Sequence, residues 1–238
     1  MKLNWLGQAG YRLTAENGTG ILIDPYLSDT LHRQRGEDYA RTVPICTEML
    51  RQKTDVLIIT HIHADHMDIE TIDAVFAAAD GIAVLAPRNV LSVLRERYDG
   101  YDGRINYMMF EPGVEISLHG LLFRAVYACH SDVCPVGAVI EGDGRVICHT
   151  GDTMYHVRLT EELPRCADAL LLPVNGQGNN MNCVDAARLT RLLEPKTVLP
   201  MHWDMFARFG CDVNEFIKSL EGSGQRIQIP AYYTEIAL

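Results

Sequence analysis

The chain has 238 residues, enough to bury one sizeable core, and we expect residues 1–238 to form a single domain. Its 21 Lys and Arg against 31 Asp and Glu give a formal net charge of −10 without a basic cluster, which argues against nucleic acid as a partner. The start of the sequence lacks the apolar segment of a signal peptide, and no run of about 18 apolar residues occurs, so we expect a soluble, cytoplasmic protein that binds no membrane.

Short apolar runs separated by turn residues recur along the chain, which is typical of many short strands. Residues 28–53 have weak periodicity and suit a loop over a functional site. The predicted strands cover residues 2–6, 11–15, 20–24, 55–60, 82–87, 114–118, 121–128, 137–141, 145–150, 169–174 and 197–201.

Two segments have the period of a helix. The first covers residues 68–80, with Asp68 as the expected N-cap. The second covers residues 182–195, with Asn182 as the N-cap and an apolar face carried by residues 184–193. Strands therefore dominate each half of the chain, with helices inserted between them.

The stretch THIHADHMD follows the apolar run DVLII and holds three histidines and one aspartate within six positions. Because side chains alternate along an extended chain, His61 and His63 should point the same way, and Asp65 and His66 follow where the strand turns. Neutral imidazoles and a carboxylate suit a divalent cation such as zinc, manganese or iron. Seven cysteines without a C-x-x-C pair do not suggest a cysteine-based zinc site. The stretch therefore predicts a metal site at a strand end.

Three further metal donors, His130, Asp152 and His202, each follow a later apolar run. Strand ends are where a rigid sheet holds catalytic groups in place. A single histidine at a strand end is more often a hydrogen-bonded structural residue, so only the combination of donors is informative.

The order of these motifs resembles the metallo-β-lactamase-fold hydrolase superfamily, whose signature is H-x-H-x-D-H, a distant His, a Gly-Asp pair and a final His. The matching residues are His61, His63, Asp65, His66, His130, Gly151, Asp152 and His202. More narrowly, the segments WLGQAGYRL, ILIDPYLSD, THIHADHMD, HTGDT, LLPVNG, NMN and MHWDMF resemble the subgroup that contains L-ascorbate-6-phosphate lactonase. The resemblance implies an α/β fold, namely an αββα sandwich of two mixed β-sheets flanked by helices, with metals at one edge of the sheets.

The resemblance also distributes the metal ligands between two positions. It implies one metal on His61, His63 and His130, a second on Asp65, His66 and His202, and Asp152 as the bridge between them. Members of the superfamily carry one or two divalent ions. Zinc or manganese is expected here, with iron as the alternative.

Such a site would provide a metal-activated hydroxide for attack on a small-molecule lactone or ester, phosphorylated ones included. Asp65 and Asp152 are the predicted catalytic residues, and we expect Asp65 to act as a ligand first and as a general base second. The expected partner is a small-molecule substrate, and a homo-oligomer would be an ordinary assembly. No residue is identified as the acid that protonates the leaving group.

Four residues near the expected ligands are candidates for orienting the imidazoles, because a ligating histidine usually donates its other N–H to a carboxylate or carbonyl. They are Asp24, Thr60, His149 and Asn175. A purely structural role is an equal alternative for each of them. Asp24 before a proline could end a strand, and Asn175 could supply a turn.

Asp24, Tyr26 and Asn175 are also the candidate substrate-binding residues. Tyr26 lies near the segment expected over the site, together with Arg33 and Arg35, whose guanidinium groups could bind a phosphate or a carboxylate. A solvated loop face is the more usual role for such arginines.

Three alternatives to a lactonase or esterase stay open. A phosphodiesterase would use the same hydroxide on phosphorus, although the acidic composition offers no basic channel for a polyanion. A di-iron redox protein on this fold commonly replaces the second histidine of the signature, whereas His63 is present here. A non-catalytic metal-binding protein is the third alternative, against which stands the complete set of seven donors.

Overall fold

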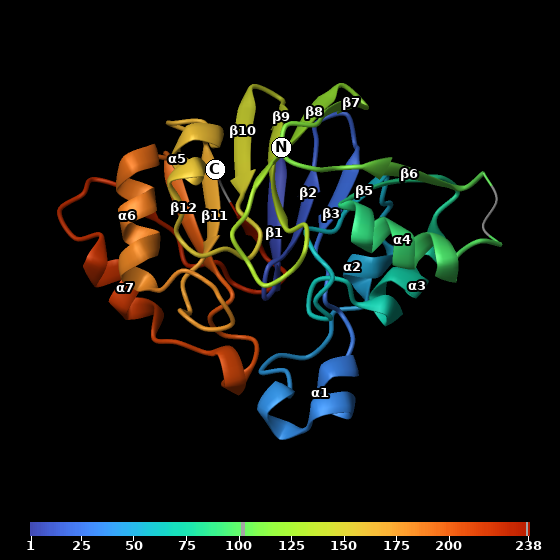
Figure 1. Cartoon of the computed structure of the whole chain (residues 1–238), viewed down its shortest axis with the longest axis horizontal. Helices are drawn as coiled ribbons and strands as arrows, with labels where there is room; N and C mark the ends of the chain where they lie inside the picture. Colours follow the sequence, from blue (N-terminus) through green and yellow to red (C-terminus); the bar gives the residue numbers. More distant parts are fainter. Residues whose placement is uncertain (101–102, 237) are drawn as a thin grey trace.

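In the computed structural model, which describes residues 1–100, 103–236 and 238, the strands assemble into two sheets that lie face to face. Figure 1 shows both sheets at the centre of the molecule and helices on the two outer sides. The expected αββα sandwich of two mixed sheets is thereby confirmed.

The first sheet comes mainly from the N-terminal half of the chain. It is formed by β1 (Lys2–Gly7), β2 (Gly10–Thr14), β3 (Gly20–Ile23), β4 (Val56–Ile58), β5 (Ile82–Ala86), β6 (Ile105–Met109) and β14 (Glu235–Ile236). Across the sheet the order is β14-β1-β2-β3-β4-β5-β6. Neighbouring strands are antiparallel from β14 to β3 and parallel from β3 to β6.

The second sheet repeats this plan in the C-terminal half. It is formed by β7 (Glu115–Leu118), β8 (Leu121–Tyr127), β9 (Val136–Gly142), β10 (Arg145–His149), β11 (Ala169–Pro173), β12 (Thr197–Met201) and β13 (Arg226–Ile227). Across the sheet the order is β13-β12-β11-β10-β9-β8-β7. Its strands are antiparallel from β7 to β10 and parallel from β10 to β13.

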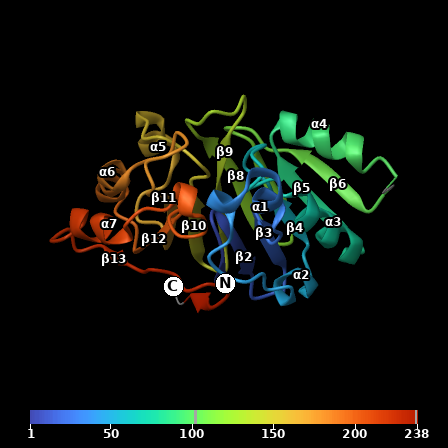
Figure 2. The same ribbon diagram turned by 90° about the horizontal axis from the view of Figure 1, so that it is seen from below.

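Helices cover the outer face of each sheet, and one helix stands apart at an end of the sandwich. The first sheet is covered by α2 (Glu48–Arg51), α3 (Ile69–Ala78) and α4 (Arg88–Arg97), and the second by α5 (Val157–Glu162), α6 (Cys183–Leu193) and α7 (Val213–Ser219). Helix α1 (Thr30–Arg35) lies at the lower end of the molecule in Figure 1, and this end faces the viewer in Figure 2. Next to it are two 3-10 turns, η1 (Glu37–Tyr39) and η2 (Ala207–Phe209). No helix in the described part of the chain has the length and apolar character that crossing a membrane requires.

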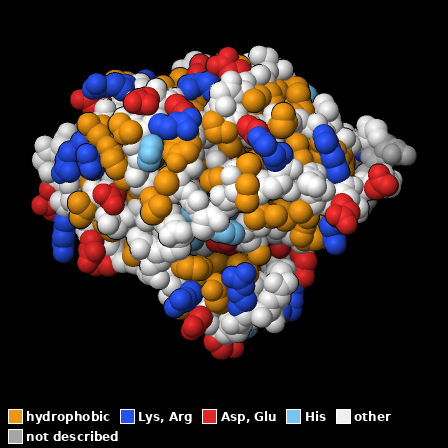
Figure 3. Space-filling model, in the orientation of Figure 1, with side chains coloured by type: hydrophobic (Ala, Val, Ile, Leu, Met, Phe, Trp, Pro, Cys, Tyr) orange, Lys and Arg blue, Asp and Glu red, His pale blue; other side chains and the backbone are white. Residues whose placement is uncertain are grey.

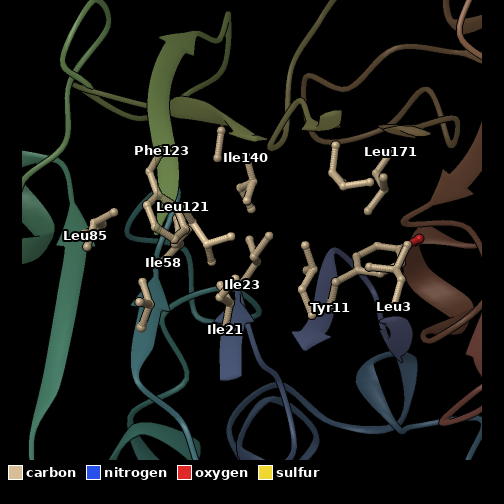
Figure 4. Packing of buried hydrophobic residues seen from close by; sticks show 14 of the residues in the cluster. Leu3, Tyr11, Ile21, Ile23, Ile58, Leu85, Leu121, Phe123, Ile140 and Leu171 are labelled. Atoms are coloured by element: carbon tan, nitrogen blue, oxygen red, sulfur yellow. The ribbon is translucent and has the colours of Figure 1, made fainter. Parts of the chain in front are cut away.

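The main core lies between the sheets, because side chains alternate between the two faces of a strand. In β3, Ile21 and Ile23 point between the sheets, whereas Leu22 packs under the helices of the first sheet. Figure 4 shows Ile21 and Ile23 facing Leu121 and Ile140 of the second sheet. Full burial of one such side chain stabilises the fold by about 1.5–3 kcal/mol. The rigid double layer that results holds the loops at its edges.

All eleven predicted strands are present, and no strand end differs from the prediction by more than two residues. The sequence does not predict β6, β13 or β14. The last two have only two residues each, and β6 is a half-exposed edge strand with a weak apolar pattern.

The two predicted helices, α3 and α6, are confirmed, and Asn182 caps α6 by accepting a hydrogen bond from the amide of Asp185. Asp68 occupies the N-cap position of α3 as predicted, but its side chain makes no cap hydrogen bond, because its carboxylate accepts hydrogen bonds from the hydroxyls of Ser28 and Thr71. One detail of the prediction is wrong. Val184 is 68% exposed, because the buried face of α6 begins one position earlier, at Cys183.

Residues 28–53 are not the irregular loop that the weak periodicity suggests. They contain α1, η1 and α2, which are short elements of three to six residues. So few turns cannot produce a readable period. Part of the segment nevertheless lies beside the candidate site, as expected.

Candidate metal centre

The candidate ligands meet at one edge of the sandwich because the strands that precede them run in the same direction. In the first sheet, β1, β3 and β4 are mutually parallel, and in the second sheet β8, β10, β11 and β12 are mutually parallel. Loops that follow these strands therefore leave each sheet at the same edge. Both sheets contribute to one cluster there.

Three histidines, which we call the histidine triad, form the first half of the cluster: His61, His63 and His130. Each offers a ring nitrogen, and the three nitrogens lie within 4.8 Å of one another. Nδ1 of His63 is 2.9 Å from Nε2 of His61 and 3.1 Å from Nε2 of His130. Three imidazole nitrogens turned toward a single point form a typical ligand set for a divalent cation.

A second triad, which we call the mixed triad, consists of Asp65, His66 and His202. Its ligand atoms also lie within 4.8 Å of one another. Oδ2 of Asp65 is 3.2 Å from Nε2 of His202 and 3.8 Å from Nε2 of His66. The rings of His61 and His66 have centroids only 4.0 Å apart, so the two triads adjoin.

Asp152 lies between the triads. Its Oδ2 atom is 3.1 Å from Nε2 of His202, 3.3 Å from Nε2 of His66 and 3.7 Å from Nε2 of His130. One carboxylate thus contacts both ligand groups, which is the position a bridging ligand requires. The Nδ2 group of Asn180 donates a 3.1 Å hydrogen bond to the same oxygen and fixes the orientation of the carboxylate.

One buried carboxylate, that of Asp24, orients a ligand in each triad. It accepts hydrogen bonds from Nδ1 of His66 at 2.8 Å and from the hydroxyl of Thr60 at 2.6 Å. Since the Thr60 hydroxyl proton points to Asp24, its oxygen accepts from Nδ1 of His61, 3.0 Å away. In both histidines Nδ1 therefore carries the proton, and Nε2 is left with a free lone pair toward the cluster.

Other groups fix His130 and His202. Nδ1 of His130 donates to the carbonyl of Asn179 at 3.1 Å, and Nδ1 of His202 lies 3.2 Å from the Asn175 amide. The backbone N–H of His202 donates to the carbonyl of Gln8. These contacts leave Nε2 of His130 and of His202 directed at the cluster.

The loop that carries Asp152 is shaped by Gly151 and His149. Gly151 has a φ of +63°, and a Cβ atom there would lie 2.4 Å from the carbonyl oxygen of Val136. His149 is fully buried and is not a ligand: its Nε2 donates to the carbonyl of Ala9, and its Nδ1 accepts from the N–H of Gly151. His149 thus supports the turn that presents Asp152.

Electrostatics distinguish the two triads. Burial and the neighbouring His66 lower the pKa of His61, and burial and His130 lower the pKa of His63, so these imidazoles are neutral ligands. Burial alone would lower the pKa of His202, but Asp152 and Asp65 raise it to about 9. The mixed triad thus attracts positive charge.

The donor set fits a cation. Nε2 of His66 and Oδ1 of Asp152 are buried and make no hydrogen bond within the described residues. Buried polar atoms without partners are costly, whereas metal coordination would satisfy them. Neutral imidazole nitrogens together with carboxylate oxygens suit zinc, manganese or iron. The His/Asp cluster is therefore a metal-binding cluster.

A cavity of about 410 Å³ opens over the cluster. Its floor holds His63, Asp65, His130, Asp152 and His202. Its walls come from the α1–η1 segment, from η2 and from the loops after β4, β8 and β11, with Leu31, Arg35, Tyr39, Ile62, Ala64, Ser131, Gln177, Gly178, Asn179, Asn180 and Phe209 as lining residues. Figure 3 shows the hollow near the centre of this face, with histidine and acidic atoms visible in it.

The structure brings together all seven predicted ligands but not the three candidate substrate-binding residues. Asp24 is fully buried beneath His61 and His66, and Asn175 lies behind His202, so both orient ligands. Tyr26 is fully buried, and its hydroxyl accepts from the amide of Leu31. None of the three lines the cavity, because each packs under the residues that do.

Sequence reasoning missed Gln8 and Asn180. The Gln8 amide donates a 3.0 Å hydrogen bond to Oδ2 of Asp65. Gln8 follows β1, which is parallel to β3, so the strand directions could have placed it at the metal edge. Asn180 stands in the segment NGQGNNMN, where several amide residues are equivalent by pattern.

Comparison with known proteins identifies related chains. Residues 19–203 match the β-lactamase superfamily domain. The chain is 31% identical over 222 residues to a UPF0173 protein of Pyrococcus furiosus. The aligned region covers 93% of this chain and 91% of that relative. It is 29% identical over 231 residues to a UPF0173 metal-dependent hydrolase of Ignicoccus hospitalis, covering 94% and 91%. Among solved structures, Igni18, a metallo hydrolase from Ignicoccus hospitalis, aligns with a TM-score of 0.76 at 27% identity and covers 99% and 97% of the two chains.

Proposed function

The chain belongs to the UPF0173 family of metal-dependent hydrolases within the metallo-β-lactamase superfamily, and we propose that it hydrolyses a lactone or another ester of a small molecule, phosphorylated ones included. The observation that supports this proposal is the position of Asp152 between two adjoining ligand triads at the floor of a cavity. The relatives do not support the narrower resemblance to L-ascorbate-6-phosphate lactonase. The lactone is therefore proposed from the sequence motifs alone.

The residues that would hold the metals are those of the two triads, with Asp152 shared. A bound divalent cation lowers the pKa of a coordinated water and polarises a carbonyl oxygen. We propose zinc or manganese, with one or two ions bound and iron as the alternative.

Asp65 would have two tasks. Its Oδ2 atom accepts from the Gln8 amide and faces Nε2 of His202, which holds the carboxylate at the cavity floor. In this position it would serve first as a ligand and second as the acceptor of a proton from the attacking water. Asp152, fixed by Asn180, would keep both triads at a constant separation.

The cavity size supports a small-molecule substrate, since about 410 Å³ falls in the usual range of roughly 300–1,000 Å³ for such sites. A polymeric phosphodiester would need a basic path that a chain of net charge −10 without a Lys/Arg cluster does not offer. A small phosphodiester remains the alternative substrate. A cytoplasmic location and a homo-oligomer are parts of the same proposal.

The test measures metal content by elemental analysis and turnover of sugar lactones, phosphorylated lactones and phosphodiesters, before and after chelation. We expect lactone opening that a chelator abolishes and that returns when zinc or manganese is added. The variant Asp65→Asn should lower kcat by about 10²–10⁴-fold. Asp38→Asn, at an exposed position of η1, is the matched control and should keep full activity.

Three results would contradict the proposal. Turnover of phosphodiesters alone would indicate the phosphodiesterase. Iron with a redox-active optical spectrum would indicate the di-iron redox protein. Bound metal without turnover of any substrate would leave a non-catalytic metal-binding protein.

A further inference from the structure

The mouth of the cavity is formed in part by helix α1, which presents Arg35 to it. Leu31 and Arg35 are four residues apart and so lie on the same face of the helix, and both line the cavity. Leu31 is buried against Tyr26 and Phe206. This apolar anchor fixes the helix and thereby fixes where Arg35 stands.

Arg35 has no ionic partner among the residues that the structure describes. Its guanidinium lies over the ring of Tyr39, 5.4 Å from the ring centroid. Arg33, two positions earlier on the same helix, instead forms an ion pair with Glu70. A guanidinium that is stacked on an aromatic ring, and thus oriented, keeps its hydrogen-bond donors free for a ligand.

The charge distribution inside the cavity is uneven. Arg35 is the one Lys or Arg among the described lining residues, whereas the floor carries Asp65 and Asp152. Figure 3 shows both basic and acidic side chains on the lobe that α1 forms, next to the hollow with the acidic and histidine atoms. The chain as a whole is acidic, with a net charge of −10, so an unpaired guanidinium makes this part of the cavity locally positive. It offers an attractive site for a negatively charged group.

Two kinds of side chain line the cavity besides the candidate ligands. Leu31 and the rings of Tyr39 and Phe209, whose centroids are 5.8 Å apart, are apolar. Gln177 and Asn179 carry amides. A ligand that spans the cavity would therefore meet apolar contacts, amide donors and acceptors, and a cation at the mouth.

We propose that Arg35 is a specificity-determining residue that binds a carboxylate or phosphate group of the substrate at the cavity mouth, while the ester group lies over the metal cluster at the floor. The inference rests on the proposed hydrolase function and narrows its substrate class to small anionic esters or lactones. The guanidinium binds the anion through two parallel hydrogen bonds, a geometry that carboxylate and phosphate share.

The experiment compares metal-loaded wild-type protein with the variants Arg35→Gln and Arg33→Gln. Three substrates share one ester and differ in their far end, which carries a carboxylate, a phosphate or a neutral amide. For Arg35→Gln we expect kcat/KM to fall by about 10- to 100-fold on the anionic substrates, mainly through KM. The value on the neutral ester should stay within twofold, and Arg33→Gln should behave like wild type. The ratio between the carboxylate and phosphate arms identifies the preferred anion.

A second measurement does not depend on turnover. Binding of inorganic phosphate to the metal-loaded proteins is followed by calorimetry, and Arg35→Gln should weaken a phosphate site that Arg33→Gln leaves unchanged. Metal content, determined on each sample, should be equal in all three proteins.

The outcomes separate the two proposals. Equal losses on charged and neutral esters, or no loss on either, would overturn the role of Arg35 and leave the hydrolase intact. If none of the three proteins hydrolyses any ester, the proposed function is contradicted. The calorimetric measurement of phosphate binding then tests the anion site at Arg35 by itself. Weakened binding in Arg35→Gln would then support the anion site, and equal binding in the three proteins would overturn it.

Discussion

Nδ1 of His66 donates a 2.8 Å hydrogen bond to Oδ2 of Asp24, and both side chains are completely buried. The same carboxylate reaches His61 through the hydroxyl of Thr60. Asp24 therefore couples the orientation of one ligand in the histidine triad to that of one ligand in the mixed triad. A single residue outside the cavity helps to set the geometry of both triads.

Replacing Asp24 should weaken metal binding without removing a ligand. In Asp24→Asn, the carboxylate that accepts from Nδ1 of His66, and from the Thr60 hydroxyl that orients His61, is lost. The Nε2 lone pairs of the two imidazoles are then no longer held toward the cluster. Loss of such an orienting partner typically costs about 10- to 100-fold in metal affinity. Titration against a chromophoric chelator would measure the change.

Asp68→Asn is the matched control. Asp68 is also buried in the first half of the chain, but its carboxylate binds the hydroxyls of Ser28 and Thr71. This variant should lose stability and keep its metal affinity. If both variants lost metal affinity equally, general destabilisation would explain the effect and the orienting role of Asp24 would be refuted.

Gly151→Ala should displace Asp152 and lower metal occupancy. The residue has a φ of +63°, and a Cβ atom would approach the Val136 carbonyl oxygen to 2.4 Å, so the backbone has to move. Gly144 has a similar φ of +67° but no atom within 4 Å of its Cβ position. Gly144→Ala should therefore lose only the about 1 kcal/mol that a non-glycine residue costs at a positive φ, with no steric clash added. Elemental analysis of both proteins checks the prediction, and full occupancy in Gly151→Ala would contradict it.

Much of the fold and of the ligand set is readable from the sequence, because strands and motifs are local. The run before His61 and the spacing of H-x-H-x-D-H are both contained in a dozen residues. Gln8 and Arg35 were harder, since their positions depend on strand direction and on a six-residue helix anchored by Leu31. The candidate role of Tyr26 rested on its position in the sequence close to residues that line the cavity. Sequence position alone does not show that the ring of Tyr26 is buried in the core.

Metal binding should stabilise the fold, because the ligands come from loops of both sheets. A ligand that binds only the folded state stabilises it by about 2.7 kcal/mol at a concentration 100 times its Kd. Urea unfolding with added zinc or manganese, and again with excess chelator, would measure the difference. The variant His202→Ala should shrink it, whereas His119→Ala, at an exposed turn between β7 and β8, should not. Equal stability with and without metal would contradict a site that joins the sheets.

Asp168 provides a prediction about pH that is independent of the metal. Its carboxylate accepts hydrogen bonds from Lys196 at 2.9 Å, Arg145 at 3.0 Å and the amide of Val146 at 2.8 Å. Burial alone would raise the pKa of Asp168, but Lys196, the Val146 amide and Arg145 lower it. Because the pKa is lower in the folded state, the carboxylate stabilises the fold above about pH 4. This contribution is lost as the pH falls through the folded-state pKa.

The variant Asp168→Asn should accordingly be less stable than wild type by about 1–3 kcal/mol at pH 7. We expect a value in the lower part of this range, because Lys196 and Arg145 are largely exposed and solvent screens their attraction to Asp168. The difference should shrink as the pH is lowered toward 3, because the carboxylate is then protonated in the unfolded wild-type chain, and this protonation favours unfolding. Urea unfolding of both proteins across this range measures it, with Asp80→Asn, at an exposed position, as the control. A difference that stays constant from pH 7 to pH 3 would mean that shape and hydrogen bonding, rather than the charge of Asp168, stabilise this edge of the second sheet.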